Sequence, residues 1–254
     1  MNLFERIKRK QQAGRFEKQL LETEVIEAII RFAQQAAGLK EGCGLQIRLA
    51  EGESLYGAGG RNVQAPYYLQ IFSDGSSEGC LNAGYTAGQT AAYLRFRGIS
   101  AVIPDNVPEW LQSKPADPLQ CSVVLAFGKG GLKEKNSSRD LQQELPCIRI
   151  DNEQAWSGEI LDFIKKQGMV RSEYTHMVFR NGSIHFLLKT TARRHPQQAA
   201  VDAGIQIANV MAAADELWID LETVKQKEIT EAGYLLSVRH KDIHHSAAPQ
   251  IRYA

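Results

Sequence analysis

The pattern of hydrophobic and polar positions predicts short strands that alternate with helices. Residues 65–73 are rich in aromatic and branched side chains and stop at Asp74-Gly75, a turn sequence, which predicts a strand. A helix over 82–94 follows, and its adjoining faces carry small residues, namely Ala83, Gly84, Ala87, Gly88 and Ala91. Such residues favour close approach of two backbones rather than an exposed helix. We therefore expect this helix to be buried against a sheet or another helix, with a strand over 100–103 after it.

The same order of elements is found twice in the chain. Residues 202–214 (DAGIQIANVMAAA) align with 82–94 (NAGYTAGQTAAYL) at an offset of 120 residues and share the Ala-Gly pair. Strands over 65–73 and 183–189, strands over 121–127 and 233–239, and helices over 24–37 and 157–167 form three further pairs. We interpret this as two related halves, 1–140 and 141–254, that meet across their small-residue helices as two subunits would. The alternative is the loose similarity that helix and strand pairs show in any α/β protein.

Local signals complete the first half. Apolar residues on one face predict the helix over 24–37, with Thr23 as its N-cap and Gly38 beyond its end. Residues 45–50 alternate as a half-buried strand does. The opening residues 1–15 are basic and amphipathic, which by itself favours a solvated helix docked through a few apolar side chains.

Composition excludes several classes of function. The 254 residues are 43% hydrophobic and 23% charged, as in ordinary globular proteins, and the net charge of +1 gives no reason to expect nucleic acid. The four cysteines form no C-x-x-C pair, so neither a zinc site nor a redox couple is indicated. No apolar run is long enough to span a bilayer and no signal peptide is evident, so we expect a cytoplasmic protein.

Candidate chemistry is concentrated in one loop. Residues 128–140 (GKGGLKEKNSSRD) follow the strand over 121–127 and are rich in glycine, lysine and arginine. Such a loop either binds a phosphate through backbone N–H groups and cations or is a solvated connection. It has no P-loop spacing, and no G-x-G-x-x-G is present. His240 and His244 have the spacing of a metal pair but lie in a tail with no further ligands. Because no catalytic motif is found, a cofactor is the most economical carrier of any chemistry.

These residues resemble the nitroreductase family, in the branch that fuses two half-subunits in one chain. The likeness rests on Ala65-Pro66-Tyr67, Asn82-Ala83-Gly84-Tyr85, Gly98-Ile99 and Ala126-Phe127-Gly128, with Asp202-Ala203-Gly204-Ile205 in the second half. It covers most of the chain. The resemblance implies an α+β fold of three α-β-α layers with an internal pseudo-dimer, present as a monomer or as a homodimer of such chains.

The resemblance also implies a function. Family members bind FMN at the dimer or pseudo-dimer interface and pass hydride from NAD(P)H to nitroaromatic or quinone acceptors by ping-pong turnover, with no obligatory catalytic side chain. By position, the family's phosphate-binding residues fall on two segments of this chain. These residues are Arg9, Lys10, Gln12, Arg15, Lys135 and Arg139.

The chain departs from the family pattern at three places. Gln12 replaces the serine of the first phosphate motif, residues 171–179 replace the segment that lines the flavin ring, and the strand over 100–103 lacks the family's Gly-Thr-Cys-Trp. Two hypotheses follow. The first is an FMN-dependent NAD(P)H oxidoreductase, and the second is a non-catalytic relative that uses the same pocket for another ligand or for none.

Overall fold

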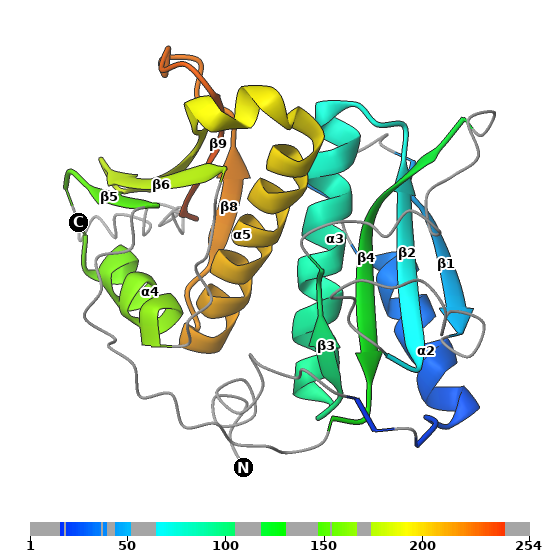
Figure 1. Ribbon diagram of the computed structural model, residues 1–254. Helices are drawn as coiled ribbons and strands as arrows, with labels where there is room; N and C mark the ends of the chain where they lie inside the picture. Colours follow the sequence, from blue (N-terminus) through cyan, green and yellow to red (C-terminus); the bar gives the residue numbers. More distant parts are fainter. Residues whose placement is uncertain are drawn as a thin grey trace, which may run out of the picture.

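The computed structural model describes residues 16–17, 19–36, 38–39, 44–51, 65–104, 118–130, 147–152, 154–166 and 174–241. These residues form two sheets of mainly antiparallel strands, each covered on one face by helices, and the longest helix of each group lies at the centre of the molecule (Figure 1). The α+β fold predicted from the sequence is therefore confirmed.

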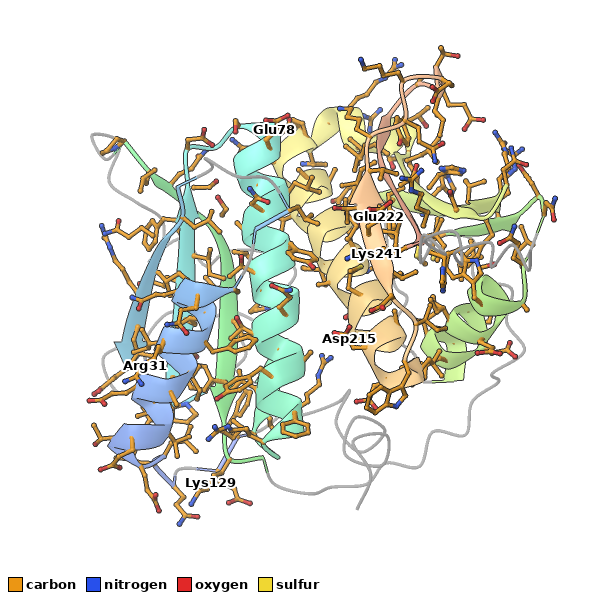
Figure 2. All side chains as sticks on the ribbon, turned by 180° about the vertical axis from the view of Figure 1, so that it is seen from behind. Arg31, Glu78, Lys129, Asp215, Glu222 and Lys241 are labelled. Carbon is orange, nitrogen blue, oxygen red and sulfur yellow. The ribbon has the colours of Figure 1, made fainter. Side chains whose placement is uncertain are left out.

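The first sheet has four strands in the order β1-β2-β4-β3, and all neighbours are antiparallel. Helices α2 and α3 lie on the same face of this sheet, as seen from behind in Figure 2. The bounds are α2 Thr23–Gln35, β1 Gln46–Glu51, β2 Tyr67–Ser73, α3 Ser77–Phe96, β3 Ser100–Val102 and β4 Gln120–Gly128.

The second sheet has five strands in the order β5-β6-β7-β9-β8. Only β5 is parallel to its neighbour, whereas the other pairs are antiparallel. The bounds are β5 Ile148–Ile150, α4 Ala155–Lys166, β6 Thr175–Arg180, β7 Ser183–Leu188, a 3-10 helix Thr190–Arg194, α5 Pro196–Leu217, β8 Leu221–Val224 and β9 Tyr234–His240.

The two halves repeat one topology. In each half a helix, two antiparallel strands, a long helix and two further strands follow in that order, and the fourth strand lies between the second and the third. The four pairs of segments aligned in the sequence occupy equivalent places, since α2 corresponds to α4, β2 to β7, α3 to α5 and β4 to β9. Strand β5 has no counterpart among the described residues of the first half. The boundary predicted at residue 140 lies outside the described residues.

Each sheet shares a hydrophobic core with its own helices. In the first half, Ile29 of α2 and Leu94 of α3 pack against the inner face of the sheet, which includes Leu69, Leu125 and Phe127. In the second half, α4 and α5 cover the face that carries Phe179, Ile184 and Phe186 among others. Because helices flank one face of each sheet, the long helices α3 and α5 are left to pack against each other between the sheets (Figure 1).

Several sequence predictions need correction at the ends of elements. Thr23 is the first residue of α2 rather than its N-cap, and Glu22 at the cap makes no side-chain capping bond. Helix α3 begins five residues before the predicted start because the Ser76 hydroxyl accepts a hydrogen bond from the Gly79 N–H and caps it. Strand β8 and the 3-10 helix were not predicted, since both are short and irregular in pattern. None of the described helices is long and apolar enough to cross a membrane.

Candidate functional site

The two small-residue helices meet at three glycines. A methyl group at Gly84 would overlap the backbone carbonyl of Val201, and one at Gly204 would overlap the carbonyl of Leu81. At Gly88, an added carbon would lie 2.6 Å from the Ala208 Cβ. The backbones of α3 and α5 are therefore in direct contact, as the sequence pattern predicted. Meanwhile Ala83 and Ala87, on the adjoining face, pack against the first sheet.

These contacts are reciprocal at the offset of 120 residues. Gly84 meets Val201, and their equivalents, Gly204 and Leu81, meet in the same way. Gly88 faces Ala208, its own equivalent. Reciprocal pairs of this kind are the property of an isologous interface about a two-fold axis. Helices α3 and α5 are thus related by a pseudo-two-fold axis that passes close to Gly88 and Ala208.

Polar side chains follow one side of α3 beside this interface. Asn82, Thr86 and Gln89 are spaced four and three residues apart, so they lie on a common side of the helix. Thr86 is 1% exposed, and its Oγ1 has no hydrogen-bond partner among the described residues. The Oε1 atom of the half-buried Gln89 is also enclosed and has no partner among them. The equivalents of Asn82 and Thr86 on α5, Asp202 and Gln206, are polar as well. Burial of polar atoms without partners is costly and rare, so these atoms need an explanation.

A carboxylate lies where the two helices diverge. Figure 2 shows Asp215 of α5 on the side of that helix that looks toward α3. Burial, and in second place the charge of Asp220, raise the pKa of Asp215. Burial, and in second place the charge of Asp215, raise the pKa of Tyr85 on α3. The ionised form of each group is therefore less favourable here than in water.

The end of the first sheet brings several motif residues together. Phe16 forms an isolated antiparallel bridge with Gly130, and the Glu17 N–H donates to the Lys129 carbonyl at 2.7 Å. Figure 2 shows Lys129 at this end of the sheet, opposite the end of α3 that carries Glu78. The chain that precedes Phe16 and the chain that follows Gly130 are therefore both connected to this end of the first sheet.

Tight packing fixes this end of the sheet. An added carbon at Gly128 would lie 2.5 Å from the Pro66 Cγ, and one at Gly130 would overlap the Ser100 hydroxyl. The rings of Tyr67 and Phe127 stack with centroids 5.4 Å apart. The Ala-Pro-Tyr, Gly-Ile and Ala-Phe-Gly segments, which are far apart in the sequence, thus converge on one point of the fold.

The six residues predicted to bind a phosphate lie outside the described residues. Arg9, Lys10, Gln12 and Arg15 precede Phe16, whereas Lys135 and Arg139 follow Gly130. Because Phe16 and Gly130 are bridge partners, both predicted segments are joined to the same end of the first sheet.

Other candidate groups are accounted for within the described part of the chain. The Asp202 carboxylate accepts a hydrogen bond from the Thr175 hydroxyl at 2.9 Å. The His240 ring lies 6.2 Å from the ring of Trp156, and His244 is outside the described residues. No group of three or more histidine, cysteine or acidic side chains in the described ranges is arranged to hold a metal ion.

The geometry defines an α+β protein of two like halves joined through a glycine interface. No protein-family model matches the chain, and no curated protein is significantly similar to it. Among solved structures it is similar to a Thermotoga maritima MSB8 protein provisionally assigned as a nitroreductase. The TM-score is 0.60 at 13% identity, over 94% of this chain and 92% of that one. The chain thus has the nitroreductase fold that the resemblance predicted.

Two further solved structures match at lower TM-scores. One is a nitroreductase family protein from Streptococcus pneumoniae TIGR4, with a TM-score of 0.45 and 16% identity over 55% of this chain and 96% of that one. The other is an FMN-dependent nitroreductase from Clostridium difficile R20291, with a TM-score of 0.45 and 14% identity over 58% of this chain and 98% of that one. At these identities the likeness concerns the fold, so function is argued from the chain's own residues.

Sequence reasoning missed Thr86, Gln89 and Asp215. A signal for the first two was present, because polar residues at positions 82, 86, 89 and 90 interrupt a stretch of small and apolar residues in this helix. A polar stripe at helical spacing on a helix expected to be buried identifies a face that needs partners. Asp215 had no such signal, since its surroundings depend on the divergence of α3 and α5.

Proposed function

We propose that this protein is an FMN-dependent oxidoreductase that takes hydride from NAD(P)H and passes it to nitroaromatic or quinone acceptors in a ping-pong cycle. The observation that carries the proposal is the convergence of three motif segments and the Phe16–Gly130 bridge at one end of a nitroreductase-like sheet. The two basic segments that match the family's phosphate-binding residues are both joined to that end. We further propose that the halves 1–140 and 141–254 arose by internal duplication.

The residues present fit an FMN molecule. The phosphate would be held by Arg9, Lys10, Gln12 and Arg15 from one segment and by Lys135 and Arg139 from the other. Lys129 adds a cation at the described end of the sheet (Figure 2). Charge-assisted hydrogen bonds from lysine and arginine to phosphate are among the strongest that proteins form.

When bound, FMN supplies the chemistry by accepting a hydride from one substrate and giving it to the next. The chain's own residues bind and orient the cofactor and shield it from water. The rigid helix interface at Gly84, Gly88 and Gly204 fixes the two halves relative to each other. Burial raises the pKa values of Asp215 and Tyr85, so a negative charge on either group is less favourable there than in water.

An absorbance scan of the purified protein, before and after incubation with FMN and gel filtration, tests the proposal. Retention of a flavin spectrum, followed by bleaching with NADH or NADPH and recovery with a quinone, is the expected result. A protein that never retains flavin would instead support the non-catalytic relative, in which the fold persists without the cofactor.

Replacement of Arg139 by alanine is expected to weaken FMN binding about 10- to 100-fold, because a charge-assisted bond to phosphate contributes about 1.5–3 kcal/mol. Titration of the apoprotein by quenching of flavin fluorescence measures the change. Arg31→Ala is the matched control, since Arg31 is an exposed arginine on α2 (Figure 2). Equal FMN affinity in the Arg139→Ala and Arg31→Ala variants would remove Arg139 from the site.

A further inference from the structure

The connection between strands β8 and β9 forms a hollow at the surface of the second half. The two strands are antiparallel neighbours, and connections between such strands usually need about two to five residues. Here residues 225–233 join them, and most of these residues, with Tyr234, line a hollow of about 550 Å³. Figure 1 shows this connection projecting from the second sheet, at the opposite end of the molecule from the end of β4. The hollow therefore lies away from the Phe16–Gly130 bridge, to which the proposed flavin phosphate residues are joined.

Hydrogen bonds anchor this connection to the second sheet near both of its ends. Near its start, the Gln226 N–H donates to the Tyr234 hydroxyl at 2.9 Å, and the Gln226 side chain donates to the Ser183 hydroxyl at 3.3 Å. At its end, the Gly233 carbonyl accepts from the Leu188 N–H at 2.8 Å. Because the connection is fixed in this way, the hollow is already formed before a ligand binds, and little conformational entropy is lost on binding.

The charged side chains that line the hollow leave an excess of positive charge. Lys225 and Lys227 are exposed lining residues, and neither ammonium group makes an ion pair with a described residue. Glu231 also lines the hollow, but its carboxylate accepts from the Arg180 guanidinium at 2.8 Å, which also binds Asp151. Two unpaired ammonium groups therefore remain. Their combined charge matches that of a phosphate monoester, which carries about −1.5 to −2 near pH 7.

We propose that this hollow binds a small phosphorylated metabolite, with the phosphate held by Lys225 and Lys227. Thr230, an exposed residue of the lining, adds a hydroxyl that can donate to a phosphate oxygen. Ile229 and Tyr234, both half-buried, offer apolar surface to the rest of the ligand. The volume of the hollow is within the range of about 300–1,000 Å³ that is typical of small-molecule sites. The inference does not depend on the proposed flavin chemistry.

The test follows the backbone amide NMR signals of the full chain during titration with ribose 5-phosphate, and with ribose as the probe that lacks the phosphate. Ribose 5-phosphate should shift the signals of residues 225–233, with or without FMN, and ribose should not. The double variant Lys225→Gln, Lys227→Gln should bind ribose 5-phosphate roughly tenfold more weakly, as expected for the loss of two exposed ion pairs. Arginine at both positions should retain binding. Lys241→Gln is the matched control, because Lys241 is an exposed lysine beyond the other end of β9 (Figure 2).

Three outcomes would overturn the inference. The first is that millimolar ribose 5-phosphate leaves the signals of residues 225–233 in place, and the second is that ribose shifts them equally. The third is equal affinity for ribose 5-phosphate in the glutamine double variant and in Lys241→Gln. The result is independent of the flavin experiment. A protein that retains no flavin but binds ribose 5-phosphate at this hollow would contradict the proposed function and support the inference, whereas the reverse result would do the opposite.

Discussion

Alanine at Gly84 is expected to destabilise the protein by at least about 3 kcal/mol, an unusually large effect for the addition of one methyl group. The new Cβ would overlap the Val201 backbone carbonyl, and a backbone atom cannot rotate away as a side chain can. The helices α3 and α5 would have to separate along their whole contact. The gain in helix propensity from glycine to alanine, about 1 kcal/mol, offsets only part of this cost. Chemical denaturation of wild type and variant measures the difference.

The control exchanges the small residues of the pair Gly88 and Ala208, which lies at the pseudo-two-fold axis. Gly88→Ala places a methyl group 2.6 Å from the Ala208 Cβ, so here the conflict is with a side chain that can be removed. Gly88→Ala alone should destabilise, and Gly88→Ala combined with Ala208→Gly should recover nearly wild-type stability. No recovery in the double variant, or a tolerated Gly84→Ala, would mean that the helices do not approach as described.

The second large effect is expected on the pH dependence of stability, and it arises from His185. This residue lies on the outer face of the second sheet and is 5% exposed. Its Nδ1 lies 2.7 Å from the Ser237 hydroxyl, which lies 2.7 Å from the Tyr234 hydroxyl, and the latter accepts from the Gln226 N–H at 2.9 Å. When Nδ1 carries no proton it accepts from the Ser237 hydroxyl, which in turn accepts from Tyr234; a second proton on the ring would place a charge in a buried position and make both hydroxyls reverse their direction.

Stability is therefore expected to fall as the solution is acidified. Burial is the largest cause and lowers the pKa of His185, and the positive charge of Arg180 lowers it further. The negative charges of Glu231 and Asp151 act in the opposite direction, but the net shift of the pKa is downward. In the unfolded chain a histidine titrates near pH 6.5, so below this pH the unfolded state binds more protons than the folded one. The stabilisation is fully present above about pH 6.5 and is lost as the pH falls through the folded pKa.

His185→Asn isolates this contribution. Asparagine keeps an acceptor for Ser237 but has no proton to gain, so the variant should lose stability less steeply between pH 7.5 and pH 5.5 than wild type does. At pH 7.5 it should be less stable by roughly 1–3 kcal/mol, because a buried ring is replaced by a smaller side chain. Burial also lowers the pKa of His176, so part of the slope should remain. Parallel slopes for wild type and variant would contradict the assignment.

Much of the fold could be predicted because local pattern and tertiary packing agree. The aromatic and branched residues of β2 are buried along the whole strand, and the glycines of α3 lie where two backbones meet. Helix α3 has almost no amphipathic pattern because it is buried on nearly all sides, so its small residues and not its periodicity revealed its place. The strand pairing and the repeat of topology follow from the same pattern in the second half.

The candidate site was harder to predict because it depends on contacts between distant segments. Nothing in the sequence near Phe16 indicates a bridge with Gly130, more than 100 residues away. The sequence marks Thr86 and Thr90 alike, yet one hydroxyl is satisfied by its own helix and the other is not. Such differences depend on the local surroundings of each side chain, which residue type alone does not specify. The six phosphate-binding residues remain a prediction.

The pseudo-two-fold relation within one chain has a consequence for how the protein can change. In a symmetric homodimer a single mutation alters both equivalent positions at once, so each must suit both copies. Here Gly98 and Trp218, equivalent residues at the ends of α3 and α5, share a left-handed backbone with φ of 77° and 58°. One is a glycine, whereas the other is a tryptophan that is 95% exposed. A continuous chain can thus specialise one side for a ligand while the other keeps the scaffold, a freedom that identical subunits lack.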